Sequence, residues 1–173
     1  GKTSRANKRQ IDEFNTYHEN LLECIKIANE YKIPTFVLGV GLGGLIVLNL
    51  LEKAELPIEG VMLLSPMLEL RRTGKGRKNK IISNLGKMSK DTRFKVGISS
   101  QDLTRNEEII DETDNDGLML KKVTYRWYNL IVEKMKETMD HIKDIKQLPA
   151  LIMYGTEDKI LETDAIIELK DKL

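Results

Sequence analysis

The sequence has very little of what several classes of protein require. It contains a single cysteine, Cys24, so no disulfide can form within the chain, and so few thiols are typical of a reducing compartment. Its longest apolar stretch, residues 45–51, is interrupted by Asn49 and is far shorter than the roughly 20 residues that cross a bilayer. These absences predict a soluble, cytoplasmic protein without a membrane-spanning helix.

Neither sign of charge dominates the composition. The chain has 28 basic and 27 acidic side chains among 173 residues, a formal net charge of +1. This balance provides no broad field that would attract nucleic acid, so any electrostatic contact must be local. The clearest local cluster runs from Arg71 to Lys80 and has six basic residues in ten. It is either a solvated loop or a contact for anionic lipid head groups at a membrane surface.

Helical segments alternate with short apolar runs along much of the chain. Apolar side chains or good helix formers at helical spacing occupy three segments: residues 11–31, 45–54 and 163–173. Continuous apolar runs typical of buried strands occupy three others: residues 35–39, 60–65 and 148–155. Thr163 is the expected N-cap of the last helix. Because parallel strands need helical crossovers, this order predicts an α/β protein with a parallel sheet.

A charged, helix-rich stretch interrupts this alternation and contains no convincing strand. It covers residues 67–147, which we expect to form an inserted helical cap on a core made of residues 1–66 and 148–173. A core sheet of three strands would leave two open edges, and open edges pair readily with other chains. The sequence therefore predicts either that another chain covers an edge, as in a homo-oligomer, or that the sequence is part of a longer chain.

A cluster of glycines, from Gly39 to Gly44, lies between the first expected strand and the next helix. Gly39, Gly41 and Gly44 fit the dinucleotide-binding pattern G-x-G-x-x-G, in which glycines admit a pyrophosphate to a helix N-terminus. That pattern also requires an acidic residue at the end of the following strand, whereas this strand ends at Ser65. The glycine cluster therefore fits a nucleotide site only in part.

The same cluster also fits the nucleophile elbow G-x-S-x-G, a strained turn that raises one side chain above the sheet. Gly39 and Gly43 supply the two flanks, and Gly41 stands in the place of the serine. The run from residue 36 to 46 resembles the elbow of monoacylglycerol lipases and bacterial lysophospholipases, serine aminopeptidase S33-like members of the α/β-hydrolase superfamily. Val40 and Gly41 depart from the family pattern G-H-S-M/L-G-G.

Further stretches support the resemblance, in the order in which the family has them. Residues 64–66 resemble the end of the family's next strand, and residues 101–106 and 114–118 resemble two segments of its cap. Residues 154–160 are similar to the H-G-x-x-D-x-[IV] segment that carries the catalytic acid. The resemblance covers nearly the whole chain but only the middle and later part of the family fold. It implies a partial three-layer α/β-hydrolase-like sheet with an inserted cap.

The resemblance also assigns roles to individual residues. Gly41 takes the position of the nucleophilic serine, Asp158 that of the acid that orients the catalytic histidine, and the backbone N–H of Leu42 would form half of an oxyanion hole. The family's histidine lies beyond the last segment of this chain and is absent. Taken alone, Asp158 is a turn or N-cap aspartate. No cofactor or metal is expected, because the family chemistry uses none.

Other side chains with reactive groups have plainer interpretations. His18 and His141 lie in helical segments, so we expect surface or packing roles for both. Ser65 ends a neighbouring strand at the same sheet edge, but it is not expected to replace the nucleophile, because no base is available to activate it. Cys24 is expected on the buried side of its helix.

Three functions follow from the resemblance and the glycine cluster. The first is a relative of carboxylic-ester hydrolases that act on lipid esters, inactive as written because Gly41 replaces serine and the histidine is absent. The second is a non-catalytic protein whose cap still binds a lipid or a protein partner. The third is nucleotide binding through residues 39–44.

Overall fold

The structure is a computed structural model that describes residues 13–71, 89–117 and 122–173. The core elements are α1 (Asn15–Asn29), β1 (Phe36–Val40), α2 (Leu42–Leu51), β2 (Gly60–Leu64), α6 (Tyr125–His141), η1 (Ile142–Asp144), β5 (Ala150–Met153) and α7 (Thr163–Lys172). Between β2 and α6 come β3 (Arg93–Phe94), α4 (Ser100–Leu103), α5 (Glu107–Asn115) and β4 (Val123–Thr124).

Three strands form a parallel sheet in the order β1-β2-β5. Leu38 of β1 pairs in register with Met62 of β2, which pairs in turn with Leu151 of β5. Each strand arises where the sequence has a short continuous apolar run, and each crossover contains a helix. The predicted parallel α/β architecture is therefore confirmed.

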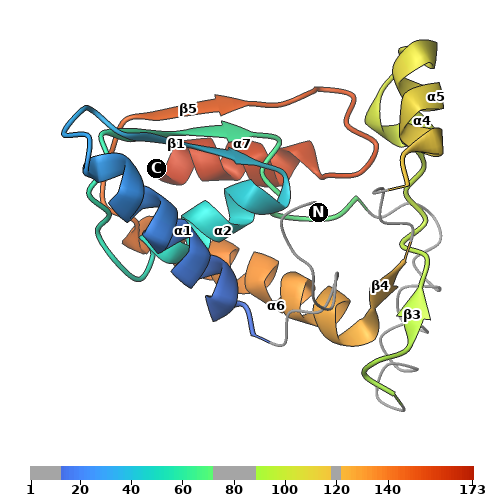
Figure 1. The fold of residues 1–173 in the computed structure, drawn as a ribbon, viewed down its shortest axis with the longest axis horizontal. Helices are drawn as coiled ribbons and strands as arrows, with labels where there is room; N and C mark the ends of the chain where they lie inside the picture. Colours follow the sequence, from blue (N-terminus) through green and yellow to red (C-terminus); the bar gives the residue numbers. More distant parts are fainter. Residues whose placement is uncertain (1–12, 72–88, 118–121) are drawn as a thin grey trace.

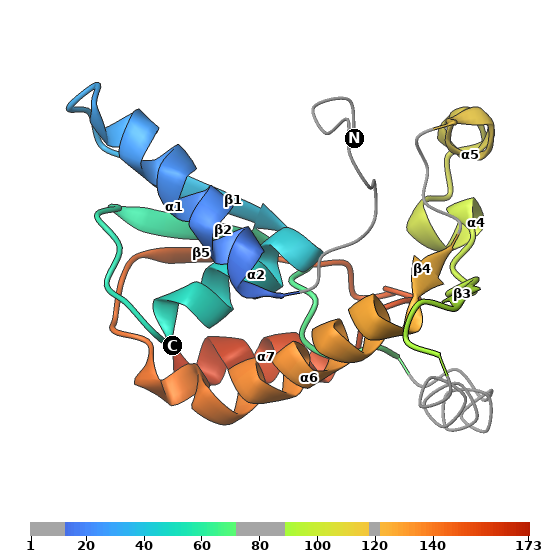
Figure 2. The same ribbon diagram turned by 60° about the horizontal axis from the view of Figure 1, so that its bottom comes forward.

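The hydrophobic core lies between one face of this sheet and the helices. Figures 1 and 2 show α2, α6 and α7 on the same side of the sheet, and α1 contacts α2. Val37 and Leu63 point from the strands into a cluster of buried side chains that includes Leu48 of α2 and Leu169 of α7. Leu48, Leu63 and Leu169 are completely buried. This packing positions the strand ends and the glycine turn that follows β1.

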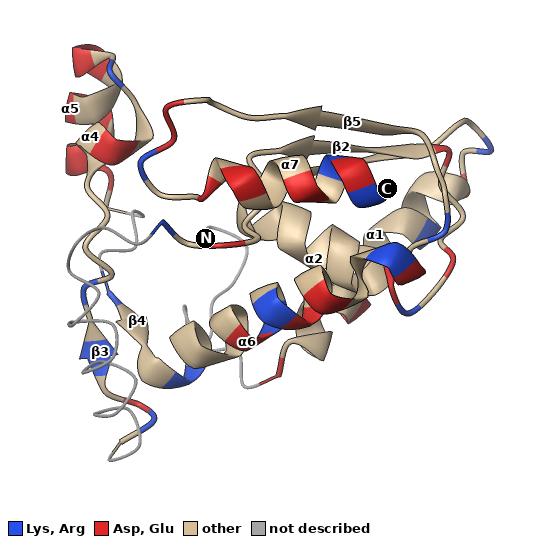
Figure 3. Ribbon diagram, turned by 180° about the vertical axis from the view of Figure 1, so that it is seen from behind, with Lys and Arg blue, Asp and Glu red and all other residues tan. Residues whose placement is uncertain are grey.

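The opposite face of the sheet is apolar but largely uncovered. Two rows of side chains cross it in register, Leu38–Met62–Leu151 and Val40–Leu64–Met153. Leu38 is 56% exposed and Leu151 is 51% exposed. Figure 3 shows β2 and β5 without a charged residue. Parallel sheets normally have both faces covered, so this face is unusual for a parallel sheet. Within the described residues, β1 and β5 each pair with one neighbour only.

The segment between β2 and α6 lies beside the carboxyl ends of the strands (Figure 1). Its α4 and α5 are short helices, as the sequence predicts, but β3 and β4 form an antiparallel pair that the sequence analysis missed. Each of these strands is only two residues long, too short for an alternating pattern to be recognised.

Helix α6 packs on the core, although the sequence analysis assigned it to the cap. Its residues Ile131 and Met135 join a buried cluster with Phe14 and Leu45. The buried side-chain amide of Asn49 in α2 also donates a hydrogen bond of 3.0 Å to the hydroxyl of Thr138. The division into a core of residues 1–66 and 148–173 and a cap of residues 67–147 stays a prediction. These contacts favour a cap that ends before α6.

Two details of the helices differ from expectation. The N-cap of α7 is Glu162, whose backbone is extended, and Thr163 is already the first helical residue. Cys24 is exposed, so its expected burial is wrong. The buried residues of α1 are His18 and Ile25, seven positions apart on one face. Cys24 precedes Ile25 by one residue, and a step of one residue turns the side chain about 100° away from that face.

Candidate functional site

Gly41 forms the turn between β1 and α2. Its backbone has φ +52° and ψ −115°, a conformation that residues with a side chain rarely adopt. Its N–H donates to the carbonyl of Leu64 at 3.0 Å, and its own carbonyl accepts from Gly44 at 3.0 Å and from Met67 at 2.9 Å. The turn is therefore held by β2 and by the loop that follows β2.

The four glycines of this turn have different surroundings. A Cβ at Gly39 would lie 2.7 Å from the Cα of Gly44, and a Cβ at Gly44 would lie 2.7 Å from the Cβ of Pro66. A Cβ at Gly41 or Gly43 would meet nothing within 4 Å. Close packing of β1, α2 and Pro66 thus accounts for Gly39 and Gly44, whereas position 41 has room for a side chain.

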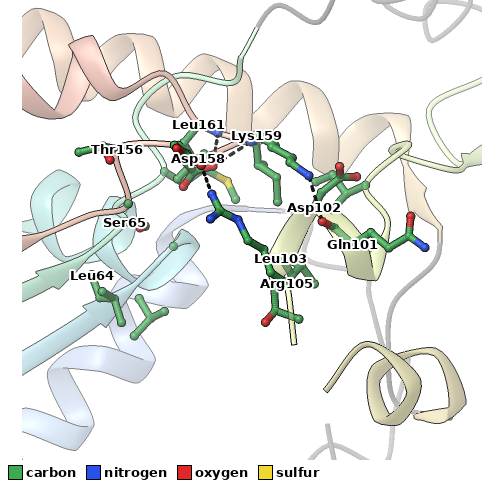
Figure 4. Close-up of a pocket in the computed structure, with 18 residues that line it drawn as sticks. Leu64, Ser65, Gln101, Asp102, Leu103, Arg105, Thr156, Asp158, Lys159 and Leu161 are labelled. Atoms are coloured by element: carbon green, nitrogen blue, oxygen red, sulfur yellow. Dashed lines mark hydrogen bonds and ion pairs between the residues drawn. The ribbon is translucent and has the colours of Figure 1, made fainter. Parts of the chain in front are cut away.

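A cavity of about 830 Å³ opens above this turn. It is bounded by the carboxyl ends of β1 and β2, the loop after β5, and α4 with the residues that follow it (Figure 4). Gly41, Ser65 and Asp158 all line it, although they lie far apart in the sequence. Apolar groups from several segments complete the wall: Val40, Leu64, Met67, Ile98, Leu103, Ile160 and Leu161.

Asp158 lies in the loop after β5 and is half-buried. One oxygen of its carboxylate, Oδ1, accepts hydrogen bonds from the backbone N–H groups of Ile160 at 2.8 Å and Leu161 at 2.9 Å. Its backbone carbonyl accepts from Nη1 of Arg71 at 2.6 Å. Asp158 is thus a turn aspartate by its contacts, and it also lines the cavity. Its role as a catalytic acid stays a prediction.

Leu42 is the first residue of α2, where a backbone N–H has no acceptor within the helix. Such a group is free to donate to a ligand oxygen, as the resemblance expects. The side chain of Leu42 packs against the buried cluster around Phe14 and Leu45. It is not among the residues that line the cavity.

Contacts across the cavity join the cap to the loop after β5. Arg105, which follows α4, forms an ion pair with Glu157. Lys159 donates through Nζ to the backbone carbonyl of Gln101 at 3.4 Å. Arg105 and Gln101 lie in the 101–106 segment that carries part of the family resemblance, and this signal could have marked them as site residues. The partners of both on the Asp158 loop were not predicted.

The family model for serine aminopeptidases of the S33 type matches residues 1–173. The chain belongs to the S33 family. The resemblance inferred from the glycine turn and the 154–160 segment is therefore confirmed. This S33 chain is also similar to the phospholipase YtpA of Bacillus subtilis (strain 168), with 28% identity over 169 residues. The match covers 97% of the chain and 65% of the relative.

Solved structures support the α/β-hydrolase fold of the S33 chain. A monoacylglycerol lipase from Paleococcus ferrophilus matches with a TM-score of 0.73 and 24% identity, over 90% of the chain and 60% of the lipase. A soluble variant of the monoglyceride lipase from Saccharomyces cerevisiae, in complex with a substrate analog, matches with a TM-score of 0.81 and 21% identity. This match covers 95% of the chain and 58% of the yeast lipase. The S33 chain thus spans less than two thirds of the length of these relatives.

Neither histidine of the S33 chain lines the cavity. His18 in α1 is only 6% exposed and packs edge-on against the ring of Phe14, with ring centroids 5.2 Å apart. His141 at the end of α6 is exposed, and its Nδ1 lies 3.0 Å from Oδ2 of Asp144. The expected packing and surface roles are confirmed. The structure brings no histidine to Gly41 or Asp158 within the residues that it describes.

His18 makes the stability of the S33 chain depend on pH. Burial, followed by the positive charges of Lys53 and Lys134, lowers the pKa of His18 from its usual 6.5, against the opposing carboxylate of Glu137. Its Nε2 is buried without a hydrogen-bond partner among the described residues. The folded state therefore favours the neutral ring. We expect the contribution of the neutral His18 ring to the free energy of unfolding to be fully present above about pH 6.5. This contribution declines as the pH falls below that value.

Urea denaturation at a series of pH values measures this effect. His18→Gln should flatten the decline, whereas His141→Gln should steepen it, because the hydrogen bond to Asp144 raises the pKa of His141 and that residue stabilises the protonated fold. Equal pH profiles for the unsubstituted chain and His18→Gln would contradict the assignment to His18.

The predicted basic segment falls largely outside the described residues. Of the basic segment from Arg71 to Lys80, the structure describes only Arg71, which contacts the Asp158 loop. No group of three or more His, Cys, Asp or Glu residues that could hold a metal is found in the part of the chain that the structure describes. No helix there is long and apolar enough to cross a membrane.

Proposed function

We propose that the cavity above Gly41 binds a lipid-like carboxylic ester, and that the chain is a hydrolase relative that does not cleave this ester as written. The observation that carries the proposal is Gly41 itself. It has the strained backbone of a nucleophile elbow, lines the cavity and has room for a side chain, yet it carries none. The phospholipase and lipase names of the relatives support the choice of substrate class.

The proposed loss of activity has two causes. Gly41 offers no hydroxyl to attack the ester carbonyl, and no histidine stands beside it in the described structure to accept a proton. Losing the nucleophile or the base of such a triad lowers kcat by roughly 10⁶-fold. In this proposal the N–H of Leu42 and the carboxylate of Asp158 keep the roles of oxyanion donor and orienting acid. Without a nucleophile, no oxyanion forms for the N–H of Leu42 to bind. Without a histidine, the carboxylate of Asp158 has no ring to orient.

The test joins the chain to the segments of the Bacillus relative that it does not match, with Gly41→Ser added. Hydrolysis of p-nitrophenyl butyrate and of monoacylglycerol is measured for the chain alone, the chimera and the substituted chimera. We expect activity only in the substituted chimera, because only it combines a nucleophile with a complete fold. Gly43→Ser is the matched control, since position 43 also has open space but does not form the strained turn.

Activity in the chimera that keeps Gly41 would show that the nucleophile lies elsewhere. Inactivity in a folded, substituted chimera that still binds monoacylglycerol would favour the second candidate, a pseudoenzyme that binds lipid or protein without cleaving it. The observation that supports this candidate is the cavity of about 830 Å³ beside Gly41, a residue without a side chain. Nucleotide binding through Gly39–Gly44 is the third candidate, and its readout is the binding of a dinucleotide to the same proteins.

The proposal extends to partners and location. A second copy of the chain is proposed to cover the open sheet edges, because β1 and β5 each have one paired neighbour among the described strands. The basic segment from Arg71 to Lys80 is proposed to contact anionic membrane surfaces. The near balance of charge provides no basis for nucleic-acid binding, and the single cysteine favours a cytoplasmic location.

A further inference from the structure

Ser65 has an unusual backbone conformation directly beside the glycine turn. Its φ is +42°, in the left-handed region that favours glycine. Among the described residues other than glycine, Lys32 alone shares a positive φ, at +54°. Lys32 lies after α1 and does not line the cavity. Ser65 follows β2 and does line it.

Hydrogen bonds and packing on both sides hold Ser65 in this conformation. Its N–H donates to the carbonyl of Met153 in β5 at 2.8 Å, and the carbonyl of the preceding Leu64 accepts from Gly41 at 3.0 Å. The following Pro66 is completely buried, with Gly44 packed closely against it. The surroundings therefore determine the backbone of Ser65, and strained residues of this kind cluster at binding sites.

The side chain of Ser65 is available to a ligand. The residue is half-buried at the cavity wall, and its hydroxyl has no hydrogen-bond partner among the described residues (Figure 4). Since no histidine lies beside it, nothing in the described site activates this hydroxyl as a nucleophile. A neutral hydroxyl can still donate one hydrogen bond and accept others.

We propose that Ser65 is a ligand-positioning residue whose hydroxyl binds the polar head of the lipid-like ester, next to Gly41. This inference rests on the proposed function and deepens it. The apolar wall of the cavity would accept an acyl chain with little directional preference. A hydroxyl at the strand end would instead bind the ester or glycerol oxygens and set which end of the ligand lies over the turn.

The experiment separates the strain from the hydroxyl. Ser65→Gly removes both, Ser65→Ala removes only the hydroxyl, and Lys32→Gly relieves the same kind of strain away from the cavity. Thermal denaturation and calorimetric titration with 1-octanoylglycerol are measured for the three variants and the unsubstituted chain. We expect Ser65→Gly and Lys32→Gly to raise Tm. We expect Ser65→Gly and Ser65→Ala, but not Lys32→Gly, to weaken binding about fivefold, the effect of one hydrogen bond.

Equal affinity of the unsubstituted chain and both Ser65 variants for 1-octanoylglycerol would overturn the role of Ser65 and leave the proposed function intact. No binding by the unsubstituted chain would overturn the proposed ester site itself, and the role of Ser65 with it. A loss of affinity in Ser65→Gly without a loss in Ser65→Ala would show that the backbone rather than the hydroxyl governs binding, which also rejects the inference.

Discussion

Alanine at position 44 is expected to lower the free energy of unfolding by about 1–3 kcal/mol, whereas alanine at position 43 is expected to raise it by about 0.4–1 kcal/mol. The two glycines are neighbours in the first turn of α2, but only one has a close neighbour in space. A Cβ at Gly44 would lie 2.7 Å from the Cβ and 2.9 Å from the Cα of Pro66. Pro66 is rigid and completely buried, so the clash cannot be relieved by a rotamer change.

Position 43 has neither a close neighbour in space nor a strained backbone. A Cβ there meets nothing within 4 Å, and Gly43 does not have a positive φ, so alanine reduces the entropy of the unfolded chain without strain in the fold. Urea denaturation of the two single variants measures both effects, with the slope of each transition checked against that of the unsubstituted chain. Equal destabilisation by the two substitutions would contradict this account of the turn.

If the chain self-associates through its sheet, as proposed, Leu38→Lys is expected to weaken that association about a hundredfold. Leu38 is 56% exposed at the centre of β1, in the row Leu38–Met62–Leu151 that crosses the uncovered sheet face. If the second copy proposed for the open sheet edges also covers this face, the substitution buries an unpaired ammonium group in an apolar interface. That costs about 3 kcal/mol, which corresponds to roughly two powers of ten in Kd.

Sedimentation equilibrium over a range of protein concentrations measures this effect. Leu22→Lys is the matched control, because Leu22 is also an exposed leucine, at 41%, but lies on α1 away from the sheet face. We expect the unsubstituted chain and Leu22→Lys to associate and Leu38→Lys to sediment as a monomer. A monomeric unsubstituted chain at high concentration would reject the second copy as the cover of the sheet.

The candidate site could be located from the sequence because its main signal is local. Gly41 and its flanking glycines are consecutive, and a strand–glycine–helix pattern predicts a tight turn at the carboxyl end of a sheet. Asp158 was identified from a short segment after the third strand. Parallel strands bring their carboxyl ends to one edge of the sheet, and the structure places both residues at the wall of the same cavity. The ion pair of Arg105 with Glu157 joins segments with no shared local pattern and could not be predicted.

The sequence by itself determined the order of strands and helices along the chain, the parallel direction of the strands and the position of the glycine turn. Each of these was predicted from patterns that span a few residues: apolar runs, helical spacing and the conformational freedom of glycine. Only the tertiary structure decided that α6 packs on α2, that Cys24 faces solvent and that Ser65 has a positive φ. The physical reason is that these properties are set by remote contacts. Ser65 is held by Met153 and by the Gly44–Pro66 packing, segments that no local pattern relates to one another.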